Sequence, residues 1–350
     1  MVFKKVMRMF GVGGPSVDTV LVNPNTRPGL TLDGHINIVG GDHDVHIEHV
    51  ALSLATRVEV ESGDSEYQVP EDFHRVVVSG PFALAAGQHW QIPFSFPVPW
   101  ETPITDIYGQ RLHGMTMGLR TEVAVAKAVD KGDLDPIFVH PLPAQERILD
   151  AFARLGFRFA RADLERGYIH GVHQTLPFYQ EIEFYPPPQY ANGINEVEVT
   201  FVTDPHGVEV ILEFDKRGGF FTPGQDVYGR FRVEHAAVDQ TDWTAVVDSW
   251  VRQASERYFS WRASHGYAPP PAHGGYAPPH GGYAPPMHGG YAPPPPPVHG
   301  GHAPSHGSAV GAALAGAAGG LIGGMMLGAA MDELFDGDGD DDGGDADFGE

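Results

Sequence analysis

Residues 91–136 read QIPFSFPVPWETPITDIYGQRLHGMTMGLRTEVAVAKAVDKGDLDP, and this stretch indicates how the rest of the chain is organised. Its first part alternates apolar residues with prolines at positions 93, 97, 99 and 103. Because proline fixes φ and has no backbone N–H, this part predicts an extended edge strand or a loop, not a central strand. Residues 117–127 then alternate as a strand does, and a charged run at 130–136 ends it. We expect one all-β unit before this stretch and a second one after it.

Composition divides the chain into a globular part and a different C-terminal part. The 350 residues include 45 Gly and 31 Pro, and most of that excess lies beyond residue 264. A chain of this length can hold two domains. It has no cysteine, which excludes disulfides, thiol catalysis and cysteine-ligated zinc and fits a reducing cytoplasm.

The net charge of −23 argues against nucleic acid as a partner. All 22 Lys and Arg residues lie at or before position 262, and ten acidic residues lie in 332–350. Without those ten, 35 acidic residues still exceed the 22 basic ones. A body this acidic lacks the basic face that contacts to phosphate require.

The N-terminal segment MVFKKVMRMFGVGG interleaves basic and apolar residues. It lacks the uninterrupted apolar core and the cleavage site of a secretory signal. Instead it predicts a short amphipathic helix with Val2, Phe3, Val6, Met9 and Phe10 on one face. Two interpretations stay open: a helix packed on its own domain, or a weak contact with a membrane surface.

Short alternating segments separated by Gly and Pro predict a β-sandwich in the first unit. The expected strands are 16–22, 30–39, 45–61, 73–79 and short ones within 82–91. In the long segment 45–61 the apolar face changes between Ile47 and Val50, so we expect a β-bulge near Glu48 and His49.

The second unit opens with a helix at 143–156, where apolar residues follow helical spacing and Gly156 marks the end. Strands are then expected at 157–163, 175–185, 196–204, 208–216 and 229–234. A closing helix is expected at 241–254, with Thr241 as its N-cap.

From residue 265 the sequence becomes low in complexity. Repeats of HGGYAPP cannot bury a core and predict disorder or partial polyproline II. Residues 310–331 are uncharged and rich in Gly and Ala, and three readings stay open for them: self-association or partner binding, disorder, and membrane insertion. An acidic tail follows at 332–350.

Three clusters of polar residues could form a functional site, and each also has a simpler structural interpretation. Residues 42–49, DHDVHIEH, could present His46 and Glu48 as two metal ligands, but two ligands do not make a site, and a solvated polar face is favoured. Asp130, Asp133 and Asp135, with Lys127 and Lys131, favour an interdomain salt-bridge cluster over a cation site. His170 and His173 have no third partner in the sequence and read as ordinary strand or loop residues.

The acidic tail mimics part of a calcium-binding loop. From Asp338, aspartates stand at loop positions one, three and five and glycine at position six. Position twelve is Gly349, where a bidentate glutamate is needed, so a solubilising or interaction tail is favoured. Nucleophile-elbow, phosphate-loop and dinucleotide motifs are missing from the chain.

Several stretches are similar to one known family. NTRPGLTLDGHINI, VHIEHVALSLATRVEVE, IPFSFPVPWETPIT and LHGMTMGLRTEVAVAKAVDKGDLDP resemble the bacterial sporulation-control proteins of the stage-zero M type, which are arrestin-like. RILDAFARLGFRF, QTLPFYQEIEFYPP and NEVEVTFVTDP extend the resemblance over residues 1–257. It implies two tandem antiparallel β-sandwiches and a role in sporulation or cell development without catalysis, and it carries over no catalytic residue.

The predicted organisation is therefore all-β with a few short helices. We expect an N-terminal arrestin-like sandwich over 1–130 and a C-terminal one over 131–262 with a linker helix near 144–155. Disordered repeats follow over 263–307, then a Gly/Ala-rich segment over 308–331 and the acidic tail.

The predicted function is that of a cytoplasmic adaptor or regulator that binds other proteins. No catalytic, cofactor or metal residues are predicted, and the partner-binding residues stay unassigned. The alternative is a membrane-associated structural protein that uses the N-terminal helix and the Gly/Ala segment as weak anchors, and self-association through that segment is a further expectation. A metal-dependent enzyme built on residues 42–49 is the third hypothesis.

Overall fold

A computed structural model describes residues 13–62, 65–191, 193–214 and 229–264. The strands are β1 Ser16–Leu21, β2 Asn25–Thr26, β3 Thr31–Val39, β4 Val45–Ser62, β5 Ser65–Ser79, β6 Phe82–Leu84, β7 His89–Pro97, β8 Asp106–Ile107, β9 Gln110–Arg111, β10 Met117–Val125, β11 Lys131–Pro136, β12 Phe138–Val139, β13 Arg158–Arg166, β14 Phe178–Tyr185, β15 Val197–Thr203, β16 Gly207–Phe214 and β17 Gly229–Glu234. The helices are α1 Pro143–Arg154, the 3₁₀-helix η2 His235–Gln240 and α2 Trp243–Ser264. The expected N-terminal helix, repeats, Gly/Ala segment and acidic tail lie outside the described residues.

The N-terminal half is a sandwich of two antiparallel sheets. One has the order β1-β3-β7, and the other contains β11, β10 and β4, with β5 and β6 also paired to β4. Fully buried side chains from both sheets, such as Ile36, Leu54, Phe96 and Leu119, fill the space between them. The predicted bulge is confirmed, because the register of β10 on β4 steps from His49 to Ile47 and skips Glu48.

Strand β7 confirms the prediction that the proline-containing segment is an edge strand. Among the described strands it pairs with β3 alone, so it is an edge of its sheet. The Val98 N–H donates to Leu30 O at 2.7 Å, so even-numbered residues of β7 point their N–H toward β3 and odd-numbered ones point away. Pro93 and Pro97 therefore stand where no ladder hydrogen bond is lost.

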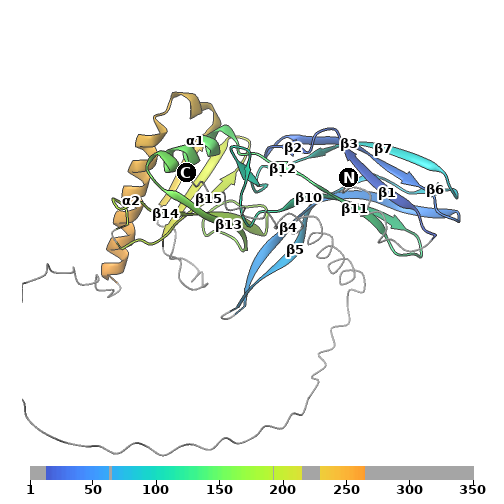
Figure 1. Ribbon diagram of the computed structural model, residues 1–350, viewed down its shortest axis with the longest axis horizontal. Helices are drawn as coiled ribbons and strands as arrows, with labels where there is room; N and C mark the ends of the chain where they lie inside the picture. Colours follow the sequence, from blue (N-terminus) through green and yellow to red (C-terminus); the bar gives the residue numbers. More distant parts are fainter. Residues whose placement is uncertain (1–12, 63–64, 192, 215–228, 265–350) are drawn as a thin grey trace, which may run out of the picture.

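The C-terminal half is a five-stranded antiparallel sheet in the order β13-β14-β15-β16-β17. In Figure 1, α1 and α2 lie over one face of this sheet. Apolar residues of both helices, among them Ile148, Phe152, Val247 and Val251, join the main core. Among the described residues, helices thus form the layer opposite this sheet, while the mostly β character of the chain is confirmed. Asp242, not the expected Thr241, caps α2 by accepting a hydrogen bond from the Ala245 N–H at 3.2 Å.

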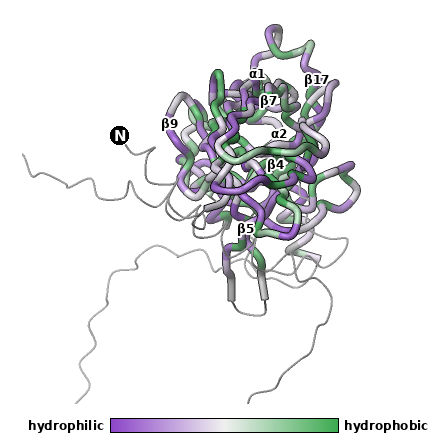
Figure 2. The backbone as a smooth tube through the Cα atoms, turned by 90° about the vertical axis from the view of Figure 1, so that its right-hand side faces the viewer, coloured by the Kyte–Doolittle hydropathy of each residue, from purple (hydrophilic) through white to green (hydrophobic). Residues whose placement is uncertain are grey.

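Strand β4 links the two halves. Its first part pairs with β10, and farther along Glu59 pairs in parallel with Glu165 of β13, so one sheet runs through both halves. Figures 1 and 2 show the end of the β4–β5 hairpin reaching beyond the body. The boundary expected at 130/131 falls inside a hairpin, because β11 pairs with β10 from Val123↔Lys131 to Gly118↔Pro136. Among the described residues, no helix is long and apolar enough to cross a bilayer.

Candidate interdomain binding groove

The segment that follows β7 braces the two halves against each other. The Gln180 side chain on β14 forms two hydrogen bonds with the backbone of Ile104. Its Oε1 accepts from the Ile104 N–H at 3.0 Å, and its Nε2 donates to Ile104 O at 2.8 Å. Both residues are buried, with Gln180 8% and Ile104 0% exposed. Because a buried backbone N–H or C=O without a partner costs about 1–3 kcal/mol, this amide holds the segment firmly on the C-terminal sheet.

Two further contacts extend the brace toward its N-terminal end. The Glu101 carboxylate accepts the backbone N–H groups of Thr175 and Leu176 at 2.8–3.0 Å. The Thr203 hydroxyl, at the end of β15, donates to the carbonyl oxygen of Trp100. Residues 100–104 are thus bonded at three points to the C-terminal half, and we call this segment the brace.

The brace also contacts the N-terminal half of the protein. The indole of Trp100 lies over Gly29, where a Cβ would approach the ring to 2.6 Å, so glycine is required there.

Two contacts outside the brace also join the halves. The first is a close approach at Gly114, where a Cβ would collide with the carbonyl oxygen of Ala162 in β13. The Tyr108 hydroxyl donates to Asp150 of α1, and burial together with this bond raises the pKa of Tyr108.

A groove of about 310 Å³ opens beside the brace, and both halves contribute to its walls. Trp100 and Glu101 come from the brace, His173 and Thr175 from the loop between β13 and β14, and Val202 from β15. The other lining residues are Val172 in the loop between β13 and β14, Thr203 at the end of β15, Asp204 and Pro205 in the turn between β15 and β16, Glu209 on β16, and Arg230 and Arg232 on β17. The groove therefore depends on the brace staying against the C-terminal sheet.

Ion pairs order the charged wall of the groove. Arg232 donates to both oxygens of Asp204 at 2.8 Å, and Arg230 pairs with Glu209. The bond from Arg232 holds the pKa of Asp204 well below its usual range, with help from the backbone N–H groups of His206 and Gly207. Three of these four side chains are 34–45% exposed and Glu209 is 15% exposed, so the pairs position one another and add little stability. The wall thus presents guanidinium groups and carboxylates in fixed positions next to an apolar floor.

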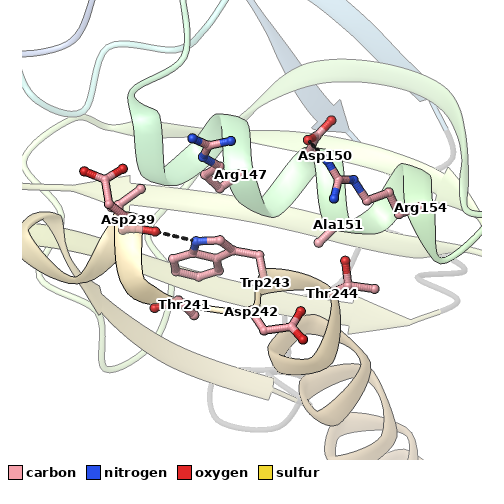
Figure 3. Close-up of a pocket in the computed structure, with 10 residues that line it drawn as sticks. Arg147, Asp150, Ala151, Arg154, Asp239, Thr241, Asp242, Trp243 and Thr244 are labelled. Carbon is pink, nitrogen blue, oxygen red and sulfur yellow. Dashed lines mark hydrogen bonds and ion pairs between the residues drawn. The ribbon is translucent and has the colours of Figure 1, made fainter.

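A second groove, of about 350 Å³, lies wholly within the C-terminal half (Figure 3). Figure 3 shows Arg147, Asp150 and Arg154 of α1 on one side and Asp239 and Asp242 on the other. The indole N–H of Trp243 donates to Val238 O at 2.8 Å, which fixes the floor of this groove. Basic and acidic side chains face each other across this groove, but no residue of the brace lines it.

The residues singled out as metal ligands do not come together. His46 and Glu48 are exposed, while His49 lies 2.9 Å from Glu122 in an ion-paired cluster that includes Arg75. Within the described part of the chain, no three His, Asp or Glu side chains are placed to hold a metal ion.

The aspartates expected between the domains lie elsewhere, which corrects that prediction. Asp133 accepts the Thr19 N–H at 2.8 Å, so it belongs to the seam between β1 and β11 inside the N-terminal sandwich. Burial raises the pKa of Asp135 to about 8, with the charges of Asp133 and Asp18 adding to the effect. Asp130 accepts the Val125 N–H within the same hairpin turn.

His170 and His173 lie in the loop after β13, as ordinary loop residues do. His173 nonetheless lines the groove, which the sequence did not indicate. Sequence reasoning also missed Gln180, Glu101 and Arg232. A partial signal was present: the strand segment FYQEIEFY carries Gln180, Glu181 and Glu183 among apolar residues, and a buried amide needs a specific partner.

Comparison with known proteins gives one consistent result. The family model described as SpoOM protein (Spo0M) matches residues 3–218. The sporulation-control protein Spo0M of Bacillus subtilis is 34% identical over 216 residues, which is 61% of this chain and 81% of that protein. The crystal structure of Spo0M from the same organism superposes with a TM-score of 0.62 and 31% identity, covering 69% of this chain and all of that one.

Proposed function

Because this chain belongs to the Spo0M family of sporulation-control proteins, we propose that it regulates sporulation or cell development as a non-enzymatic adaptor in the cytoplasm, binding a partner protein in the interdomain groove. The observation that carries the proposal is the brace. Three bonded points hold the halves in one arrangement, and that arrangement creates a groove with residues from both.

The chemistry of the groove suits protein recognition. Its floor is apolar at Val172 and Val202, and its rim carries paired charges whose donors and acceptors stand in fixed positions. Interfaces between proteins commonly combine an apolar centre with a polar rim. Pre-ordered side chains lower the entropy cost of binding, so a small groove of this kind can support specific recognition.

Site-specific photo-crosslinking in the native host tests this function. A photoreactive phenylalanine replaces His173 or Pro205 at the groove, and Ser249 on the exposed face of α2 serves as the matched control. We expect a discrete crosslinked protein from the groove positions during development, and a much weaker one from Ser249. Equal crosslinking from all three positions, or none from the groove, would contradict binding there.

The brace supplies a second test of the same proposal. Gln180→Met should reduce crosslinking at the groove because the two halves lose their fixed arrangement. Gln91→Met removes only an exposed hydrogen bond to Asn37 and should leave crosslinking unchanged. Heat-resistant colony counts of the host carrying each variant then link groove binding to sporulation.

A further inference from the structure

The connection between β13 and β14 forms one wall of the interdomain groove. Residues 167–177 contain no helix or strand, and Val172, His173 and Thr175 from this connection line the groove. Connections without regular structure are usually the most mobile parts of a fold. A partner that had to order such a wall would bind more weakly, because ordering costs conformational entropy. What holds this connection in place therefore decides how well the groove can bind.

The half-buried side chain of Gln174 bonds this connection from inside. Its Nε2 donates to Gly167 O at 2.9 Å, at the start of the connection. The same nitrogen donates to Leu176 O at 2.7 Å and to Phe178 O at 3.0 Å, at its end. Its Oε1 accepts the Ile169 N–H at 3.2 Å. Two N–H hydrogens thus serve three carbonyl oxygens, and one amide joins the start, the middle and the end of the connection.

Neighbouring elements hold other points of the connection. The Glu101 carboxylate of the brace accepts the Thr175 N–H at 2.8 Å, and Arg230 of β17 donates to the carbonyl oxygen of Gly171. Ile169, which is 2% exposed, packs in a small apolar cluster on the C-terminal sheet. Each of these contacts fixes a single place on the wall, whereas the Gln174 amide fixes the path of the chain between them.

We propose that Gln174 is the positioning residue of the interdomain groove, and that it holds His173 and Thr175 where a partner protein meets them. This inference rests on the proposed function and names the residue that prepares the same groove for binding. Gln174 is not among the residues that line the groove, so it acts through its two neighbours in the chain. The partner then meets a wall that is already formed, and its binding does not include the cost of ordering that wall.

Glutamine suits this position because its amide carries donors and an acceptor at the end of one side chain. A glutamate of the same shape would place an oxygen where the Gln174 Nε2 now faces three carbonyl oxygens, so the bonds would be lost and repulsion added. A methionine of similar volume would lose the same bonds without adding a charge. Gln174→Glu and Gln174→Met should therefore both release the connection.

The test uses the full chain in the native host, with the photoreactive phenylalanine at Pro205. This reporter lies in the turn between β15 and β16, outside the altered connection. Gln174→Met and Gln174→Glu should each lower the yield of the crosslinked partner about fivefold or more. The matched control is Gln189→Met, which removes one exposed bond to Leu155 O and should leave the yield unchanged. A cooperative thermal transition of each purified variant shows that it folds.

Amide exchange of the purified chain measures the order of the wall without any partner. In Gln174→Met, exchange at Ile169 and Val172 should be about tenfold faster or more than in wild type and in Gln189→Met. Exchange that stays as slow as in wild type would overturn the proposal. Fast exchange together with an undiminished crosslink from Pro205 would also overturn it, while leaving the proposed function standing. A wild-type chain that gives no groove crosslink would contradict the proposed function itself, and this inference with it.

Discussion

Gln180→Met is the substitution that bears most directly on how the two halves are joined. Methionine is close to glutamine in volume, so the packing around β14 changes little. What disappears is the pair of hydrogen bonds to Ile104, 3.0 Å to its N–H and 2.8 Å to its C=O. Ile104 is fully buried, so water cannot replace the lost partner.

The expected loss follows from those two buried groups. Each unsatisfied backbone group costs about 1–3 kcal/mol, so the free energy of unfolding should fall by about 2–4 kcal/mol after partial relaxation. In a chain of this size that corresponds to a lower Tm by roughly 5–15 °C. Urea unfolding followed by tryptophan fluorescence and circular dichroism measures the loss.

The matched control is Gln91→Met, which removes an exposed bond to Asn37 and should change stability by less than about 0.5 kcal/mol. We also expect the Ile104 amide to exchange faster in Gln180→Met, because its acceptor is gone. A stability change in Gln180→Met no larger than in the control would refute the argument that the buried amide holds the brace.

Three further predictions concern packing, pH and edges. Gly114→Ala should cost more than about 3 kcal/mol because its Cβ would collide with Ala162, whereas Gly109→Ala, also at positive φ but with open space around it, should cost only about 1–2 kcal/mol in thermal unfolding. Burial raises the pKa of Asp135 to about 8 in the folded state, so its ionisation removes stability as pH rises from about 4 to 8. Asp135→Asn should therefore be more stable than wild type at pH 8, by about 1–3 kcal/mol, with the difference vanishing near pH 4, and urea titrations at both pH values check this. Pro93→Thr restores an outward N–H on β7 and should promote self-association, measured by sedimentation velocity; a sedimentation coefficient equal to that of wild type would contradict the view that the prolines of β7 block strand addition.

Local sequence patterns predicted the elements of the fold well, because their causes are local. The strand expected at 117–127 is β10, which ends at Val125, and the skipped residue at Glu48 is the bulge expected from the change of face. The helix expected from 143 is α1. The family resemblance was also confirmed by the comparisons.

The candidate site was not predictable in the same way, because it depends on contacts between distant residues. Gln180 and Ile104 are 76 positions apart, and Thr203 and Trp100 are 103 apart. The Asp-rich segment at 130–135 looked like an interdomain link, yet its role is to join β1 and β11 within one half. A run of charges shows that a segment meets polar groups and does not show which ones.

We expect the brace to hold the two halves in one relative position, and a distance measurement across it tests this most directly. Since the chain has no cysteine, two introduced cysteines can carry spin labels at single chosen sites, one at Gln91 on β7 and one at Glu256 on α2. Double electron–electron resonance should give one narrow distance distribution for this pair in the otherwise wild-type chain and a broad one when Gln180→Met is added. A distribution equally broad with and without Gln180→Met would contradict the account.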